Sequence, residues 1–131
     1  MNKLVVIDDN AIEHLIIDRM LERTVSPPEV THFYDARLSL TWLMDHCDQK
    51  DILPDIIFLD LNIPQYNGWR FLDDYKKVEF DLCKHVDIYL ITSSIDIDDL
   101  KKSKLYKCVK SYVIKPLTSK FLNSLFSEQV N

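Results

Sequence analysis

The chain has 131 residues, the size of one ordinary domain with a single buried core. Hydrophobic residues make up 47% and charged residues 28%, which excludes a disordered chain, and the net charge of −5 argues against a general nucleic-acid-binding surface. Because Gly68 is the only glycine, both a GxGxxG dinucleotide loop and a Walker A phosphate loop are excluded.

The first half of the chain alternates short apolar runs with segments of helical spacing. Residues 4–7 and 56–59 are too short for helices and rich in β-preferring residues, so both are predicted to be buried strands. Residues 30–34 mix polar and apolar side chains, which predicts an edge strand. Helices are predicted between these strands from two spaced apolar sets: Ile12, Ile16 and Met20, then Ala36, Leu40, Leu43, Met44 and Cys47.

The second half continues this alternation. A helix is predicted from the spacing of Phe71, Leu72, Tyr75 and Val78. Residues 88–91 and 112–114 are also predicted to be buried strands. Ser94 is predicted to cap a helix with an acidic first turn and lysines at its end. The last helix is expected to start after Pro116, a residue suited to a first helical turn, and to end with the chain.

Five strands alternating with five helices predict an α/β fold, a doubly wound parallel sheet with helices on both faces. The chain contains no repeat, low-complexity tract or linker, so residues 1–131 are predicted to form one domain.

The sequence contains no segment that indicates export or a membrane span. No apolar run approaches the roughly 18 residues that cross a bilayer, and the apolar residues after Lys3 are too few for a signal peptide. We therefore expect a cytoplasmic protein. Three cysteines without CxxC spacing predict reduced thiols rather than disulfides or structural zinc; they are Cys47, Cys83 and Cys108.

Polar side chains follow the four apolar runs that predict buried strands. Asp8 and Asp9 follow the first, Asp60 the second, Thr92 the third and Lys115 the fourth. Each alone is explained as a helix cap, turn residue, strand end or surface charge. Together they place three carboxylates, a hydroxyl and an ammonium at one edge of a parallel sheet, where ligands bind, and clustered like charges are unfavourable without a counterion.

This residue set predicts phosphoryl-transfer chemistry. Three carboxylates without a Cys or His ligand pattern suit a hard cation, and Mg²⁺ fits better than a calcium cage. Lys115 and Thr92 remain as donors to the oxygens of a phosphoryl group. The pattern therefore predicts phosphoryl transfer to a carboxylate.

Along the whole chain the sequence resembles the receiver domain of two-component response regulators. The motifs are the pair Asp8-Asp9, the stretch 60–68 with its proline and glycine four and eight residues after Asp60, Thr92, Tyr112 and Lys115-Pro116. The resemblance implies a flavodoxin-like fold with strand order 2-1-3-4-5. It also implies a cis peptide before Pro116.

The resemblance assigns roles to these residues. It implies that Asp60 is the phosphoacceptor, that Asp9 binds Mg²⁺ directly and that Asp8 acts on the metal largely through water. Asn62 would offer its backbone carbonyl to the metal, and Lys115 would contact the phosphoryl group.

Two further residues, Thr92 and Tyr112, would form the switch that reports phosphorylation to the opposite face. Two departures from the family pattern are conservative: Ser93 stands where alanine is common, and Ile63 stands where methionine usually precedes the proline.

The implied function is that of a phosphoprotein in two-component or phosphorelay signal transduction. Such a response regulator receives its phosphoryl group from a histidine kinase or histidine phosphotransfer protein and signals through a separate effector protein. Its only chemistry would be self-phosphorylation and self-dephosphorylation, without nucleic-acid or membrane binding of its own. Whether the chain is a whole protein or a fragment of a longer regulator stays open.

Two alternatives belong to other classes. An aspartate-nucleophile phosphatase would also use Asp60 and Mg²⁺, but it needs a general acid at position 62, which is Asn62, and a cap domain that 131 residues do not accommodate. A phosphorylation-independent interaction module would have no need of the complete acidic set.

Other candidate side chains are predicted to pack or to lie at the surface. Four histidines have no ligand spacing: His14, His32, His46 and His85. Trp42 and Trp69 are expected to pack, with Trp69 close enough to the site to report binding by fluorescence.

Overall fold

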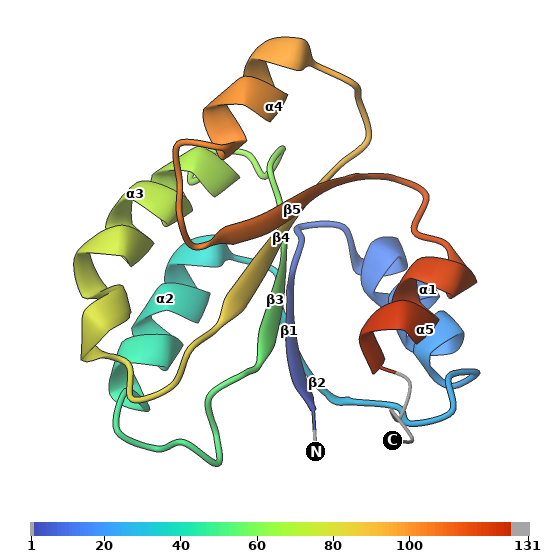
Figure 1. Ribbon diagram of the computed structural model, residues 1–131, viewed down its shortest axis with the longest axis horizontal. Helices are drawn as coiled ribbons and strands as arrows, with labels where there is room; N and C mark the ends of the chain where they lie inside the picture. The colour runs from blue at the N-terminus through green and yellow to red at the C-terminus, as the bar shows by residue number, and fades with distance from the viewer. Residues whose placement is uncertain (1, 127–131) are drawn as a thin grey trace.

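The structure, a computed structural model, describes residues 2–126 and contains one five-stranded parallel sheet (Figure 1). Its strands are β1 (Lys3–Ile7), β2 (Glu29–Phe33), β3 (Ile56–Asp60), β4 (Asp87–Thr92) and β5 (Val109–Ile114). They lie in the order β2-β1-β3-β4-β5, so the predicted doubly wound α/β fold and strand order are confirmed. The order also places β2 at an edge, as its mixed polarity predicts.

Five α-helices and one 3₁₀ turn connect the strands. They are α1 (Ala11–Leu21), α2 (Ala36–Asp45), α3 (Gly68–Val78), the turn η1 (Glu79–Asp81), α4 (Ile97–Ser103) and α5 (Ser119–Phe126). Helices α1 and α5 cover one face of the sheet, α2 and α3 cover the other, and α4 packs near β5 at the second edge (Figure 1). No helix in residues 2–126 combines the length and apolar character that crossing a membrane requires.

The core consists of two layers, one on each face of the sheet. Side chains of the central strands alternate between them: Val5 and Ile57 face α2 and α3, whereas Leu4 and Phe58 face α1 and α5. Because helices cover both faces, nearly every residue of the central strands β1, β3 and β4 is buried, and this explains why these strands are continuous apolar runs. No residue of the edge strands β2 and β5 is buried, so the prediction that residues 112–114 form a buried strand is wrong: the strand is present, but it lies at the second edge of the sheet.

The helix predicted from the spacing of Ile12, Ile16 and Met20 is present as α1, but Ile12 and Ile16 do not lie on its buried side. Ile12 is 64% exposed and Ile16 is also exposed, whereas His14, Ile17 and Leu21 are buried against the sheet. The sequence of α1 is apolar on more than one side, so spacing alone does not select the buried face. The Asn10 side chain caps the helix by accepting a hydrogen bond from the Ile12 N–H at 2.9 Å, and this cap sets where the helix begins.

The helix starts predicted near β4 and β5 also need correction. Asp96, rather than Ser94, caps α4, because its carboxylate accepts the backbone N–H of Asp98 at 2.9 Å. Helix α5 begins at Ser119, so Pro116 precedes the helix instead of opening it. The Lys115–Pro116 peptide is cis, as the family resemblance implied. The predicted end of this helix at the chain terminus lies outside the described residues.

Candidate functional site

Three aspartates meet at the carboxyl ends of β1 and β3. Asp60 is the last residue of β3, and Asp8 and Asp9 directly follow β1. One carboxylate oxygen from each of the three lies within 4.8 Å of the others. Asp8 and Asp60 are buried, whereas Asp9 is exposed, so this acidic cluster opens to solvent on one side. The structure brings together the three aspartates that the sequence predicts would meet.

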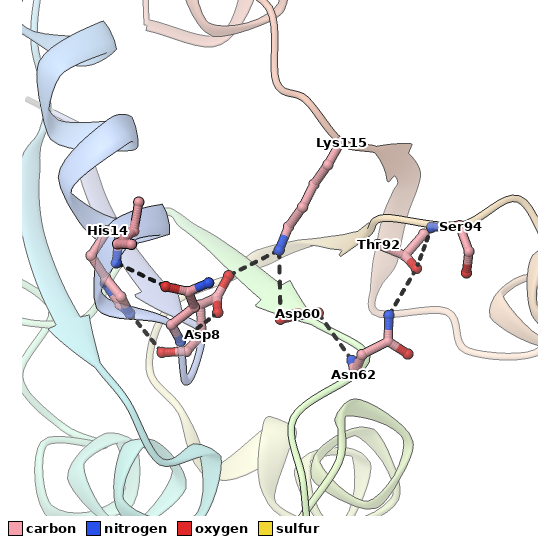
Figure 2. Close-up of polar contacts among 9 residues, drawn as sticks. Asp8, His14, Asp60, Asn62, Thr92, Ser94 and Lys115 are labelled. Atoms are coloured by element: carbon pink, nitrogen blue, oxygen red, sulfur yellow. Dashed lines mark hydrogen bonds and ion pairs between the residues drawn. The ribbon is translucent and has the colours of Figure 1, made fainter.

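Lys115 reaches this acidic cluster from the end of β5 (Figure 2). Its Nζ lies 3.1 Å from Asp8 Oδ2 and 3.6 Å from Asp60 Oδ2. Burial alone would lower the pKa of the Lys115 ammonium, but the neighbouring Asp60 and Asp8 carboxylates raise it on balance. The lysine therefore stays charged and neutralises one of the three carboxylates. The two remaining negative charges favour the binding of a cation.

The surroundings of Asp60 disfavour its ionised form. Burial raises the pKa of Asp60, and the charge of Asp8 adds to the increase. A hydrogen bond from the Asn62 N–H to Asp60 Oδ1, at 3.0 Å, and the charge of Lys115 act in the opposite direction. The outcome is a raised pKa, which a bound cation would reverse because it favours the carboxylate.

Gly68 and the helix cap at Asn67 shape the loop after Asp60. A Cβ atom on Gly68 would lie 2.9 Å from the Leu61 Cα, so any larger residue would push the start of α3 away from β3. The Asn67 side chain accepts the Arg70 N–H at 3.0 Å and caps the same helix. The motif glycine therefore keeps the loop closed beside the acidic cluster.

Thr92 at the end of β4 is the next predicted site residue, and it is buried. Its Oγ1 accepts a hydrogen bond from Asn62 Nδ2 at 3.2 Å and from the Ser94 N–H at 3.4 Å (Figure 2). The Tyr112 hydroxyl in turn donates to the Ser94 carbonyl at 3.4 Å. Since Thr92 only accepts in these contacts, its hydroxyl proton remains available for a new acceptor.

Asn62 occupies a position between the acidic cluster and Thr92. Its backbone N–H contacts Asp60 and its side-chain amide contacts Thr92. The family resemblance implies a role only for its backbone carbonyl, so the hydrogen bond from its side-chain amide to Thr92 is an additional feature that spacing along the chain does not reveal. The departure at Ile63 is buried and fits the core.

His14 is a site-adjacent residue whose contact with Asp8 sequence reasoning missed. Of the two predicted placements, packing or surface, His14 has the first: it is buried, with its Nε2 2.7 Å from the Asp8 carbonyl oxygen (Figure 2). Its Nδ1 lies 2.6 Å from His32 Nδ1, and His32 Nε2 lies 2.9 Å from an Asp18 carboxylate oxygen. The signal available in the sequence was its spacing with Ile17 on one face of α1.

A groove of about 260 Å³ leads from Asp9 along the start of α2 and the loop before α3. Tyr66 forms one wall and donates its hydroxyl hydrogen to Asp74. The guanidinium carbons of Arg37 and Arg70 lie 4.9 Å and 5.1 Å from the centre of the Tyr66 ring. The groove beside the open side of the acidic cluster therefore carries charges of both signs, since Asp35 and Arg37 both line it.

Known proteins resemble this chain over most of its length. The chain is 27% identical to the probable methanogenesis regulatory protein FilR2 of Methanothrix harundinacea over 125 residues, which cover 95% of this chain and 79% of that protein. It is similar to the structure of a two-component response regulator from Cytophaga hutchinsonii, with 28% identity, 94% and 92% of the two chains covered and a TM-score of 0.83. It is also similar to the phosphorylated cyanobacterial phytochrome response regulator RcpA, with 26% identity, 95% and 87% covered and a TM-score of 0.74.

The family comparison covers nearly the whole chain. The model of the response regulator receiver domain matches residues 4–126, a range that includes the acidic cluster, Thr92 and Lys115. This protein is therefore a member of the response regulator receiver domain family, a family of signalling modules.

Proposed function

We propose that this receiver domain accepts a phosphoryl group on Asp60 from a phosphohistidine of a histidine kinase or histidine phosphotransfer protein, in a reaction that requires Mg²⁺. The observation that carries the proposal is the junction of Asp8, Asp9 and Asp60 within 4.8 Å, with Lys115 beside two of them. The phosphorylated state recorded for the similar regulator RcpA supports the same chemistry.

The donor set of the site fits Mg²⁺. The carboxylates of Asp8, Asp9 and Asp60 and the backbone carbonyl of Asn62 would hold the ion, and all of these are the oxygen ligands that this cation prefers. Three carboxylates and one ammonium leave two negative charges, which one divalent cation balances. When bound, Mg²⁺ supplies positive charge that offsets repulsion between an anionic phosphodonor and the carboxylates.

Asp60 is the nucleophile in this proposal. One of its carboxylate oxygens forms a bond to phosphorus while the bond between phosphorus and the donor imidazole nitrogen breaks, so the product is an acyl phosphate on Asp60 and a free histidine. Oδ1 is oriented by the Asn62 N–H. Lys115 stays protonated beside Oδ2 and offers its ammonium to an oxygen of the transferred group.

The switch residues would then respond to the new charge. A phosphoryl group adds strong acceptor oxygens next to Asp60, and the free hydroxyl proton of Thr92 can donate to one of them. That movement would break the contact with Asn62 and change the loop that Tyr112 holds through the Ser94 carbonyl. Phosphorylation would thereby alter the surface around α4 and β5.

This surface has the properties of a partner-binding face. Large apolar side chains are exposed on it: Ile95, Ile97, Leu100, Leu105 and Ile114. We propose that a separate effector protein contacts this face in one state more tightly than in the other.

A second exposed apolar set would receive the phosphodonor. Ile12, Leu15 and Ile16 lie exposed on α1, and Ile16 lines a groove of about 250 Å³ together with Lys115 and Pro116. A donor protein that packs on this set would bring its phosphohistidine toward the acidic cluster. We place this phosphorelay in the cytoplasm, with residues 1–131 as one receiver domain and with self-phosphorylation and self-dephosphorylation as its only chemistry.

The proposal is tested by labelling with a small acyl phosphate. Intact-mass measurement should show one added phosphoryl group in the presence of Mg²⁺ and none with EDTA, and Asp60→Asn should abolish the addition. The exposed loop variant Asp48→Asn carries the same charge change and should label like the wild type. Undiminished labelling of Asp60→Asn that hydroxylamine removes would place the acceptor elsewhere.

A further inference from the structure

The backbones of Cys47 and Cys83 lie side by side although the two residues are 36 positions apart in the sequence. The backbone N–H of Cys83 donates to the carbonyl oxygen of Cys47 at 2.8 Å. This contact and standard bond lengths limit the distance between the two Cα atoms to about 6.7 Å. Natural disulfides join Cα atoms about 4.4–6.8 Å apart, so the two backbones are already within bridging distance.

Several other contacts hold these two segments in place. The Lys84 ammonium donates to the Leu53 carbonyl at 2.9 Å and pairs with the Asp55 carboxylate at 2.9 Å. The Asp87 N–H donates to the Asp55 carbonyl at 3.0 Å. The segment after α2 is therefore fixed against the segment that enters β4, at the end of the strands opposite Asp60 (Figure 1).

We propose that Cys47 and Cys83 form a reversible intramolecular disulfide when the protein meets a low-molecular-weight disulfide such as glutathione disulfide. All three cysteines are free thiols in the structure, so the bridge belongs to an oxidised state. Cys83 is exposed and accessible to the reagent, and Cys47 is half-buried beside it. The proposal concerns a modification site remote from the phosphoacceptor and does not depend on the proposed function.

The exchange proceeds in two balanced steps. The Cys83 thiolate attacks one sulfur of glutathione disulfide, which forms a mixed disulfide and releases one glutathione thiolate. The Cys47 thiolate then attacks the Cys83 sulfur, which forms the bridge and releases the second glutathione. The two thiol protons end on the two glutathione molecules, so the protein is oxidised by two electrons and the reagent is reduced by two.

Cys108 provides an internal control. It is buried next to β5, and burial raises the pKa of its thiol to about 11. It therefore stays protonated at neutral pH and should not react under conditions that oxidise the other two cysteines.

The bridge would close a loop that contains β3 and α3. Closing a loop of this length restricts the unfolded chain, so the oxidised protein should melt several degrees higher than the reduced protein if the native backbone holds the bridge without strain. The acidic cluster lies outside the contact region of the two cysteines. The bridge should consequently leave labelling of the protein by acyl phosphate unchanged.

The test treats the reduced full chain with glutathione disulfide, alkylates the remaining thiols and applies intact mass, non-reducing peptide mapping and thermal melting. Wild type and Cys108→Ser should lose two hydrogen atoms, yield one Cys47–Cys83 cross-linked peptide and melt higher until dithiothreitol is added. Cys47→Ser should instead keep one glutathione on Cys83.

Three results, each readable on the wild type, would overturn the proposal. They are a wild type that carries glutathione on Cys83 at equilibrium without a cross-link, a cross-link that involves Cys108 or a second molecule, and a cross-linked protein that melts lower than the reduced one.

Discussion

At the scale of single residues, Asp60 is placed where its own charge is unfavourable. Its carboxylate is buried and lies near that of Asp8, and a single ammonium, from Lys115, serves both. Such an arrangement lowers stability without a cation and is characteristic of functional sites, where reactivity takes precedence over stability.

Replacing Asp60 with Asn should stabilise the metal-free protein at neutral pH. The amide oxygen can still accept the Asn62 N–H, while the unfavourable buried charge is gone. We expect the free energy of unfolding to rise by about 1 kcal/mol at pH 7. Urea unfolding in EDTA measures the difference.

The stability that Asp60→Asn gains should depend on pH, and the direction of this dependence follows from the raised pKa of Asp60. Below the pKa of about 3.9 that an aspartate has in an unfolded chain, the carboxyl group is protonated in both states and contributes nothing. As the pH rises, the unfolded chain ionises first because the pKa of folded Asp60 is raised, and wild-type stability falls until the folded carboxyl also ionises. The gain in Asp60→Asn should therefore shrink as the pH is lowered toward 3.9. If Asp60→Asn raised the free energy of unfolding equally at pH 7 and near pH 3.9, or if Asp48→Asn raised it by the same amount, this explanation would be contradicted.

The aspartates of the site could be predicted from the sequence because each follows a recognisable strand. The ends of parallel strands meet at one edge, so identifying the strands was enough to bring Asp8, Asp60 and Lys115 together. The contact of His14 with the Asp8 carbonyl could not be predicted in the same way. It depends on which side of α1 faces the sheet.

At the scale of elements, the ends of β3, β4 and β5 are joined by a short chain of hydrogen bonds. Asn62 after β3 donates to Thr92 at the end of β4, and Tyr112 on β5 donates to Ser94 just beyond Thr92. Each contact is 3.2 Å or longer, so a charged phosphoryl oxygen is a stronger partner for Thr92 than its present ones. In the proposed switch, the phosphoryl group would therefore compete with Asn62 and Ser94 for the Thr92 hydroxyl group.

Thr92→Ala should separate phosphate capture from signalling. Asp60 and Lys115 are untouched, so labelling should persist, whereas the response of Tyr112 should be largely lost because no hydroxyl group connects it to the site. Amide spectra around Tyr112, with and without beryllofluoride, measure the response at equal occupancy. Thr92→Ser keeps the hydroxyl group and should respond. A full wild-type spectral change in Thr92→Ala would show that the relay runs through other residues.

Helix boundaries and faces were harder to predict than strands. Several residues near β4 are able to cap a helix, and only the backbone path selects Asp96 over Ser94. Helix α1 carries apolar residues on two sides, and burial selects Ile17 while Ile12 stays exposed. The exposed residues Ile12 and Ile16 belong to the surface on which we propose that the phosphodonor packs.

At the scale of the whole molecule, the sheet brings distant parts of the chain together at the acidic cluster. Lys115 and Asp8 are 107 positions apart and lie in contact. The continuous apolar runs made this architecture predictable, because strands buried on both faces need helices on both sides. The hydrogen bond between Cys47 and Cys83 at the opposite end of the sheet was not predictable, since it connects two irregular segments with no sequence pattern.

Because the acidic cluster joins the ends of β1 and β3, and Lys115 ties the end of β5 to it, cation binding there should stabilise the entire fold. Mg²⁺ that binds only the folded protein, at about ten times its Kd, should raise the free energy of unfolding by about 1.4 kcal/mol. Asp9→Ala should lose more than half of this gain at the same Mg²⁺ concentration, because Asp9 supplies the exposed carboxylate on the open side of the proposed metal site. Thermal melts in Mg²⁺ against NaCl of equal ionic strength separate binding from general screening.

Asp48→Ala removes an exposed acid elsewhere and should respond to Mg²⁺ like the wild type. If Mg²⁺ raised the melting temperature of Asp9→Ala as much as that of the wild type, Asp9 would not be a ligand of the metal.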